Sequence, residues 1–258
     1  MRRDSRRASG RPAGQTRSEP GPEFARLALG RRLVYLRREL LPLAQAIITR
    51  VEELRARAGS EGSGNRRSAI RLALENAPEL VVRLSRRGGM ARLLFDDLYF
   101  GMSPRPVREL AVASEAARRG IPVAEPMGAM VQWVWPGVYR GTFITRALSG
   151  LTLWEFVRTD DDPRVREHVL RLAREAIDTM HERGLVHADL NLHNLMVVTG
   201  AERFSVAILD LDKARLLRNP VPAPLRRRNF ARLLRSATKL DPQGRWLDAP
   251  ARKLLTEF

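Results

Sequence analysis

The sequence predicts an α+β protein of two lobes, a small antiparallel β lobe followed by a mainly helical lobe. Short runs with strand character lie mostly in the first 145 residues, whereas the clearest amphipathic helix begins after them. The chain has 258 residues, 44% of them hydrophobic, which is enough to close a core of that size. No internal repeat is visible, so the pattern does not favour a solenoid.

Composition excludes several classes of protein. The chain contains no cysteine, which excludes a disulfide scaffold, a zinc ribbon, an iron–sulfur cluster and thiol catalysis. No apolar run approaches the roughly 20 residues that span a bilayer, and residues 1–22 lack the hydrophobic segment of a signal peptide. We therefore expect a cytoplasmic protein.

The positive charge of the chain is concentrated at its two ends. The formal net charge is +17, and residues 1–38 carry 11 arginines against 3 acidic residues. Residues 213–258 carry 12 lysines and arginines against 3 acidic residues, while residues 39–212 are balanced. Basic ends around a neutral middle favour contact with an anionic surface from one side. Membrane lipid phosphates and nucleic acid both fit this pattern, although a nucleic-acid-binding domain would more often spread positive charge over its folded face.

The first 58 residues are predicted to lie outside the β lobe. Residues 1–22 are arginine, serine, glycine and proline with almost nothing apolar, which is typical of a disordered basic arm. Residues 23–58 are predicted to form a helical extension that is broken near Pro42 and ends at Gly59.

Residues 59–148 are predicted to form the β lobe. Their pattern predicts a loop, two hairpins and one helix, in the order loop 59–65, strands 69–74 and 79–84, helix 107–118, and strands 131–135 and 138–145. Pro106 opens the predicted helix and Gly120 closes it.

Residues 149–258 are predicted to form the helical lobe. Three aspartates precede Pro163, and apolar residues then recur at three- and four-residue spacing until Gly184, which predicts a long amphipathic helix. Two short strands follow, over 195–198 and 206–209, and the second ends at Asp210.

The segment 187–194, His-Ala-Asp-Leu-Asn-Leu-His-Asn, matches the phosphotransferase loop H-x-D-L-x-x-x-N at all four fixed positions. Phosphoryl transfer needs one carboxylate to accept the proton of the acceptor hydroxyl, which we assign to Asp189. It also needs a second carboxylate and an amide oxygen to hold magnesium beside the nucleotide phosphates, which we assign to Asp210 and Asn194. Asp212 either assists that metal or begins the next segment.

The same chemistry needs a strand cation that grips the nucleotide phosphates and a helix glutamate that holds the cation. Arg83 and Glu109 occupy the corresponding places in chain order, and arginine keeps the charge while it changes the geometry. If Arg83 does not contact the phosphates, Arg86 and Arg87 are the next candidates for this cation. Gly62-Ser63-Gly64 could pass over the phosphates, although no G-x-G-x-x-G is present.

Several motifs together resemble the lipopolysaccharide kinase family, and within it the kinases of 3-deoxy-D-manno-octulosonic acid (Kdo). They are Val81–Gly89, Arg105–Glu109, Gly120–Val123, His187–Asn194, Asp210–Asp212 and the tail motif Arg228–Ser236. The resemblance covers about residues 64 to 240. It implies a protein-kinase-like fold in which the β lobe, residues 59–148, binds ATP and the helical lobe, residues 149–258, is catalytic. It further implies ATP and Mg²⁺ as cofactors, and transfer of the ATP γ-phosphate to a Kdo hydroxyl of a lipid A precursor. It also implies a lipid-linked sugar as acceptor and a peripheral place on the cytoplasmic face of the inner membrane.

Two other functions are compatible with part of the pattern. A protein or other small-molecule kinase would share the loop, but only 48 residues follow Asp210, and Ala188 replaces the arginine that reads an activation-loop phosphate. A non-catalytic pseudokinase scaffold would explain the basic ends. Such a scaffold does not require Asp189, Asn194 and Asp210 together.

Overall fold

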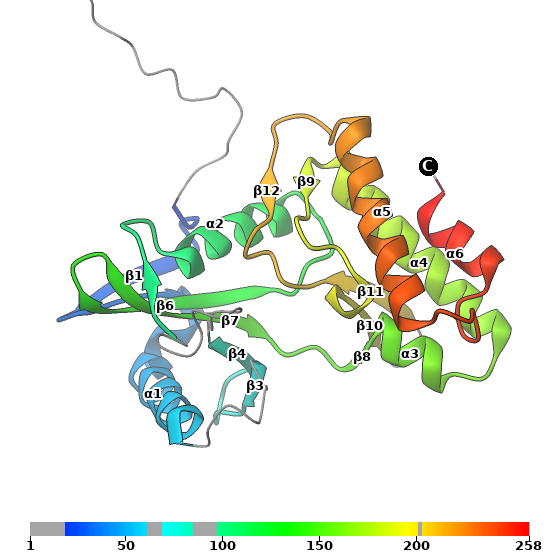
Figure 1. Ribbon diagram of the computed structural model, residues 1–258. Helices are drawn as coiled ribbons and strands as arrows, with labels where there is room; N and C mark the ends of the chain where they lie inside the picture. The colour runs from blue at the N-terminus through cyan, green and yellow to red at the C-terminus, as the bar shows by residue number, and fades with distance from the viewer. Residues whose placement is uncertain (1–18, 61–68, 85–96, 201–202, 258) are drawn as a thin grey trace, which may run out of the picture.

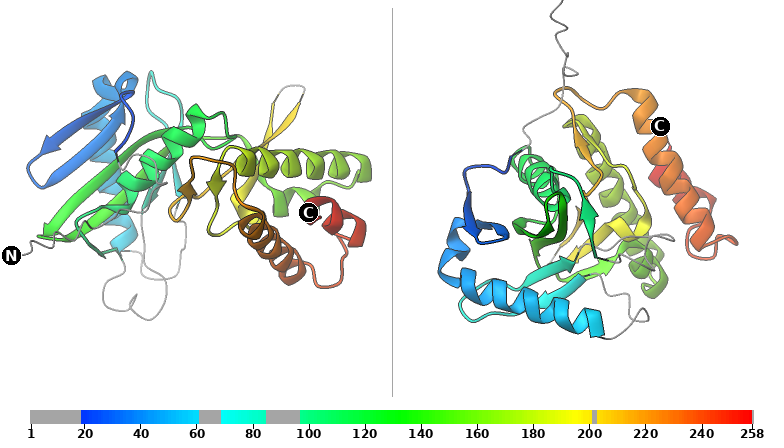
Figure 2. Two further views of the ribbon diagram at one scale, coloured as in Figure 1. Left: turned by 90° about the horizontal axis from the view of Figure 1, so that it is seen from above. Right: turned by 60° about the vertical axis from the view of Figure 1, so that its left-hand side comes forward.

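The computed structural model describes residues 19–60, 69–84, 97–200 and 203–257. Most of the predicted basic arm, the Gly62–Gly64 segment, and Arg86 and Arg87 lie outside the described residues. The chain divides into a sheet-rich part and a helix-rich part that lie end to end (Figures 1 and 2). The two-lobed α+β prediction is confirmed.

The first lobe is built on an antiparallel sheet, seven-stranded over the described residues, with the order β1-β2-β6-β7-β4-β3 and β5 paired with β7. Its strands are β1 (Phe24–Leu29), β2 (Arg32–Arg37), β3 (Ala69–Leu72), β4 (Leu80–Leu84), β5 (Tyr99–Phe100), β6 (Pro126–Trp135) and β7 (Val138–Arg146). The two predicted hairpins of this lobe form as β3–β4 and β6–β7. Gly137 between β6 and β7 adopts a positive φ of 75°, which glycine reaches without steric cost.

The predicted helix over residues 24–37 is wrong. These residues form the hairpin β1–β2, and β2 extends the sheet by pairing with β6. A short 3₁₀ helix, η1 (Arg38–Leu43), contains Pro42, and only then does α1 (Ala44–Ser60) begin. Both faces of β2 are covered, because Val34 and Leu36 are buried in one cluster and Leu33 and Tyr35 pack against another. Such a strand shows no alternation in sequence.

Helices cover both faces of this sheet. Helix α1 packs under one face through Ile47 and Val51, and α2 (Arg105–Arg118) packs on the other through Leu110 and Ala113. Figure 1 shows α2 above the long strands and α1 below them. Helix α2 carries Pro106 in its first turn, as predicted.

Over its described residues, the second lobe combines helices with two small antiparallel sheets, a three-stranded one of order β11-β10-β8 and a two-stranded one of order β12-β9. Its elements are β8 (Gly150–Thr152), α3 (Leu153–Thr159), α4 (Pro163–Glu182), β9 (Leu185–Val186), η4 (Leu192–Asn194), β10 (Leu195–Thr199), β11 (Phe204–Ile208), β12 (Arg215–Leu216), α5 (Ala223–Leu240) and α6 (Ala249–Thr256). The Asp162 carboxylate caps α4 by accepting a hydrogen bond from the Arg164 N–H at 2.8 Å. The predicted long helix and hairpin are therefore confirmed.

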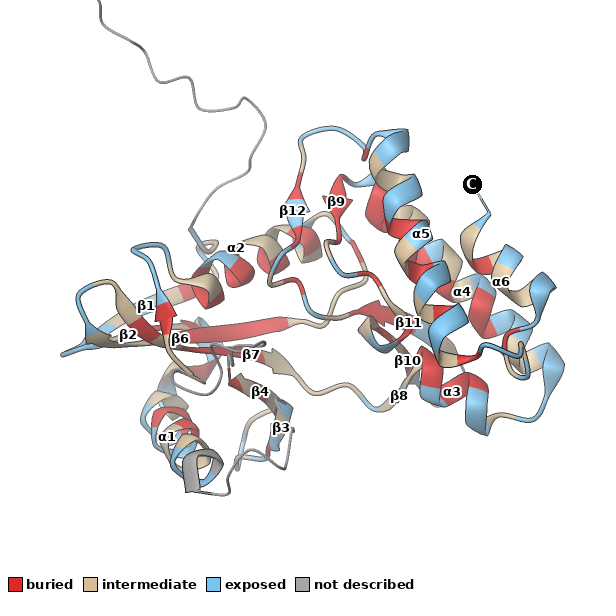
Figure 3. Ribbon diagram, viewed as in Figure 1, coloured by how far each residue is buried: buried red, intermediate tan, exposed pale blue. Residues whose placement is uncertain are grey.

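One hydrophobic core joins the two lobes. It contains Phe143 and Leu110 of the first lobe together with Ile177 of α4 and Leu233 of α5. Figure 3 shows the buried residues continuing from the long strands into the helices. A backbone bridge between Val123 and Ile208 also links the lobes. The residue boundaries of the four predicted segments stay predictions.

Candidate active site

Strand alternation decides which face of the sheet carries Arg83. On β4, Val82 and Leu84 are buried on the face of the sheet that packs against α1. The side chain of Arg83 between them therefore points to the opposite face, which α2 covers. Its partner in register is Phe143, and the guanidinium carbon lies 5.5 Å from the centre of that ring. The sheet thus aims this cation toward α2 and the second lobe.

Arg83 binds two carboxylates from different elements. One guanidinium nitrogen donates to Glu109 on α2 and another donates to Asp210, which follows β11. The Glu109 side chain is 4% exposed, and that of Asp210 is 41% exposed. The structure therefore brings together three of the residues selected from sequence, across both lobes.

The environments of the two carboxylates shift their pKa values in opposite directions. Burial raises the pKa of Glu109 from 4.5 to about 8, and the charges of Asp210 and Asp212 add to this, against the opposing effect of Arg83. Burial of Asp210 also disfavours its charge, but the guanidinium of Arg83, together with His187 and the Asp212 N–H, outweighs burial and lowers the Asp210 pKa. Asp210 is accordingly ionised at neutral pH.

Asn194 and Asp210 lie at the same end of the hairpin β10–β11. Asn194 directly precedes β10, Asp210 closely follows β11, and the N–H of Leu209 donates to the Asn194 carbonyl at 2.9 Å. Asp210 has a positive φ of 56°, which is a strained conformation for a residue other than glycine and is best tolerated by asparagine and aspartate. This turn directs its carboxylate back to Arg83.

Hydrogen bonds to the main chain fix the loop 187–194. The side-chain N–H groups of Asn194 and Asn191 both donate to the Asp189 carbonyl, at 2.8 and 3.0 Å. The amide nitrogen of Asn194 is thus occupied, and its oxygen accepts no hydrogen bond from any residue that the structure describes. Asp189 is exposed, and its carboxylate has no partner within the same described ranges.

The His187 ring hydrogen-bonds to the main chain at both of its nitrogens. Its Nδ1 accepts a hydrogen bond from the Asp189 N–H at 3.1 Å, so its Nε2 carries the proton and donates to the Leu209 carbonyl at 2.9 Å. Burial lowers the pKa of His187, which favours this neutral tautomer. The ring joins the start of the loop to the strand that leads to Asp210.

Sequence reasoning assigned no role to Asn229, although it lies in the tail motif. Asn229 on α5 is fully buried, and its Nδ2 donates to the His187 carbonyl at 2.5 Å. Its Oδ1 faces Nε2 of His181, a buried residue of α4, at 3.0 Å. The signal in the sequence is a polar residue on the apolar face of α5, next to Phe230 and one turn before Leu233.

Asp212 pairs with a different arginine of the first lobe. It forms an ion pair with Arg105 at the start of α2, with 3.6 Å between Nη1 and Oδ2. The structure thus gives Asp212 a partner of its own at the junction of the lobes.

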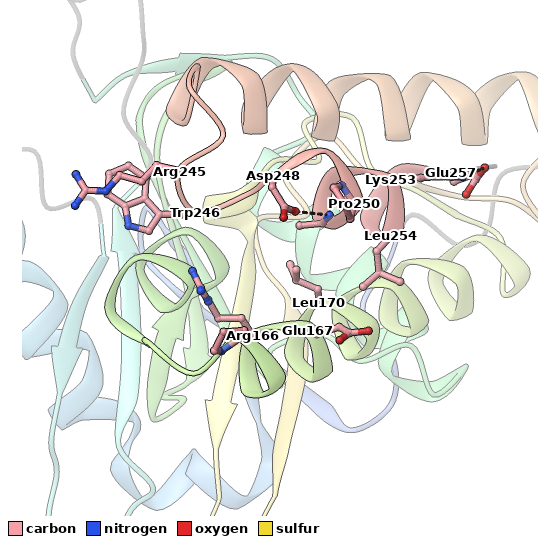
Figure 4. Close-up of a pocket in the computed structure, with 12 residues that line it drawn as sticks. Arg166, Glu167, Leu170, Arg245, Trp246, Asp248, Pro250, Lys253, Leu254 and Glu257 are labelled. Atoms are coloured by element: carbon pink, nitrogen blue, oxygen red, sulfur yellow. Dashed lines mark hydrogen bonds and ion pairs between the residues drawn. The ribbon is translucent and has the colours of Figure 1, made fainter.

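A separate cavity of about 530 Å³ opens between the start of α4 and helix α6 (Figure 4). Leu170, Trp246 and Leu254 contribute apolar surface to it, and Arg166 and Lys253 contribute charge. None of the residues selected from sequence lines this cavity. Its place in the fold therefore sets it apart from the Arg83–Asp210 cluster.

Comparison with known proteins identifies the family. The model of the lipopolysaccharide kinase (Kdo/WaaP) family matches residues 50–255. The chain belongs to this family.

Relatives within the lipopolysaccharide kinase family are named for one sugar acid. A 3-deoxy-D-manno-octulosonic acid kinase of Xylella fastidiosa (strain 9a5c) is 35% identical over 192 residues, which cover 72% of this chain and 71% of the relative. The kinase of the same name from Xanthomonas campestris pv. campestris (strain B100) is 32% identical over 164 residues, 62% of each chain. A solved structure of WaaP in complex with acyl carrier protein has a TM-score of 0.44 and 15% identity, covering 74% of this chain and 87% of that one.

A lipopolysaccharide kinase is a phosphotransferase, and the site has residues that suit a magnesium–nucleotide complex. Among the described residues, no group of three or more histidines and carboxylates could hold a metal alone. Mg²⁺ usually takes one or two protein ligands and completes its shell with phosphates and water. The ionised carboxylate of Asp210 and the available oxygen of Asn194 fit that pattern, since both are hard oxygen donors.

Proposed function

We propose that this chain transfers the γ-phosphate of ATP to a hydroxyl of a Kdo sugar in the lipid A-linked inner core of lipopolysaccharide. The observation that carries the proposal is the bridge from Arg83 to both Glu109 and Asp210, beside the loop that bears Asp189. A strand cation held by a helix glutamate and facing a metal-binding aspartate is the arrangement that phosphoryl transfer from a nucleotide requires. The names of the relatives support the sugar.

Asp189 is the proposed proton acceptor for the sugar hydroxyl. Its carboxylate is exposed and accepts no hydrogen bond among the described residues, so its oxygen atoms are available to an acceptor. Its main chain, in contrast, is fixed by His187, Asn191 and Asn194. The main chain of Asp189 is therefore held in place, while its carboxylate stays accessible to an acceptor.

Asn194 and Asp210 are the proposed magnesium ligands, and Arg83 is the proposed cation for the nucleotide phosphates. When bound, Mg²⁺ neutralises charge on the phosphates and orients them. Glu109 holds the guanidinium of Arg83 on the α2 face of the sheet, ready to contact anionic oxygens.

The test is a radiolabel transfer assay with ATP and three acceptors, namely Kdo-linked lipid A, a heptosylated core and a generic basic protein. We expect label on the Kdo-containing acceptor, and we expect chelation of magnesium to abolish it. Preferential label on the basic protein would instead support a protein kinase. Absence of transfer to any acceptor, with retained nucleotide binding, would support the scaffold alternative.

We also propose that the enzyme docks on the cytoplasmic face of the anionic inner membrane, where a lipid-linked acceptor lies. No helix that the structure describes is long and apolar enough to span a bilayer. Helix α5 instead exposes cations such as Arg228 and Lys239 to solvent. Each basic residue near an anionic membrane contributes about 1 kcal/mol, and the effect decays within a Debye length.

Vesicle flotation tests this docking. Binding should require anionic lipid and weaken with salt, and Arg228→Gln combined with Lys239→Gln should reduce it by roughly 30-fold. Arg164→Gln combined with Arg171→Gln removes the same charge from α4 and serves as the control. Equal binding to neutral and anionic vesicles would contradict the mechanism. Stronger affinity for duplex nucleic acid at matched salt would favour a nucleic-acid partner.

A further inference from the structure

Helix α5 lies along the loop that carries Asp189 and contacts it at two points. At one point Asn229 donates to the His187 carbonyl at 2.5 Å. At the other point the N–H of Leu192 donates to Oγ of Ser236 at 3.4 Å. The stretch of loop between these contacts contains Asp189, so the face of α5 between residues 229 and 236 runs beside the proposed base.

Arg232 occupies this face. It follows Asn229 by three positions and precedes Ser236 by four, the spacings that place side chains on one side of a helix. Along the helix axis it lies about 4.5 Å from Asn229 and about 6 Å from Ser236. Arg232 is half-buried. Burial is the main cause of the lowered pKa of His187, and the positive charge of Arg232 contributes to it, which agrees with a position near the loop.

Arg232 has no counter-ion within the residues that the structure describes. Two other half-buried arginines of this lobe pair with carboxylates, Arg174 with Asp178 and Arg252 with Asp241. Arg232 forms no such ion pair with any described residue, although Asp189 lies on the adjacent loop. A half-buried cation without a carboxylate partner is suited to an anionic ligand.

We propose that Arg232 binds the carboxylate of the acceptor sugar and so makes the enzyme selective for a sugar acid. This assignment rests on the proposed function, because the acceptor must lie at Asp189 for Arg232 to reach it. A guanidinium can donate two parallel N–H bonds to a carboxylate, which fixes the orientation of the sugar as well as binding it. In this assignment Arg83 binds the nucleotide phosphates, and Arg232 binds the acceptor carboxylate.

The experiment compares a soluble Kdo glycoside with its methyl ester, which lacks the carboxylate charge. Wild type should use the acid about 10- to 100-fold better in kcat/KM, the range of a charge-assisted hydrogen-bonded pair. Arg232→Gln should reduce this preference to near unity, raise KM for the acid and leave KM for ATP unchanged. Arg232→Lys should retain part of the preference, because it keeps the charge.

Arg235→Gln is the matched control, since Arg235 is an exposed arginine of the same helix. It should keep the wild-type preference. If Arg232→Gln slows the acid and the ester equally, or raises KM for ATP, the assignment of Arg232 is overturned while the proposed function stands. If wild type phosphorylates neither sugar, both are overturned. A folded Arg232→Lys variant with no preference for the acid would also contradict the proposal.

Discussion

Asn229 and His187 are joined by a hydrogen bond of 2.5 Å from a buried side-chain amide to a main-chain carbonyl. Through it, α5 holds the start of the loop that bears Asp189. The other end of the same amide faces His181 of α4. One side chain therefore connects two helices to the proposed catalytic loop.

Replacing Asn229 should destabilise the protein and misplace the loop. Asn229→Ala leaves the His181 ring and the His187 carbonyl buried without a partner, and each costs about 1–3 kcal/mol. We expect urea denaturation to show that loss, and kcat to fall at least tenfold with little change in KM for ATP. Thr238→Ala, at an exposed position of the same helix, is the control. A stability equal to that of the control would contradict the role of this bond.

Asp189→Asn should reduce kcat by about 10²- to 10⁴-fold, because it removes the proton acceptor without a change of shape. Nucleotide affinity should be unchanged, since the Asp189 carboxylate contacts none of the described residues. Single-turnover kinetics and calorimetry measure the two quantities. Residual activity within tenfold of wild type would exclude Asp189 as the base.

Asp210→Ala should abolish magnesium-dependent nucleotide binding. Asp210 is the charged member of the proposed ligand pair, and its pKa is lowered by Arg83, so it is fully ionised at neutral pH. Calorimetry with ATP in the presence and absence of Mg²⁺ gives the readout. An unchanged affinity for magnesium–ATP would place the metal on other residues.

Arg83→Ala and Arg83→Lys should separate charge from geometry. Arg83 reaches Glu109 and Asp210 with different nitrogens of one planar group, which a single lysine amine cannot reproduce. We expect the alanine variant to raise KM for ATP and lower kcat, and the lysine variant to retain part of the activity. Wild-type kinetics in Arg83→Ala would move the phosphate contact to another cation, with Arg86 and Arg87 the next to test.

The raised pKa of Glu109 predicts how stability changes with pH. The folded chain holds the proton on Glu109 up to about pH 8, whereas an ordinary glutamate releases it near 4.5. Its contribution to the free energy of unfolding is therefore fully present below about pH 4.5 and is lost as the pH rises through 8. The groups that face it are Arg83, Asp210 and Asp212.

The comparison of wild type with Glu109→Gln isolates this group. The unfolding free energy of wild type minus that of the variant should decrease between pH 5 and 8, as measured by urea denaturation at each pH. Other titrating groups cancel in the difference. A difference that increases with pH would show that the attraction of Arg83 dominates over burial.

The sequence by itself predicted which residues form the candidate site. The loop 187–194 is local, so its residues and their spacing are legible without a fold. Arg83, Glu109 and Asp210 were found by their order along the chain, and the structure brings them into contact. In the structure, the alternation along β4 places Arg83 on the opposite face of the sheet from its buried neighbours Val82 and Leu84.

Only the tertiary structure decided that residues 24–37 form a hairpin and that Asn229 holds the loop. The strand β2 is covered on both faces, so its burial by distant elements removes the alternation that marks a strand. Asn229 lies 42 residues from His187, and no local pattern reports a contact at that separation. Local periodicity reflects the environment of a single segment, whereas these two features depend on which segments pack together.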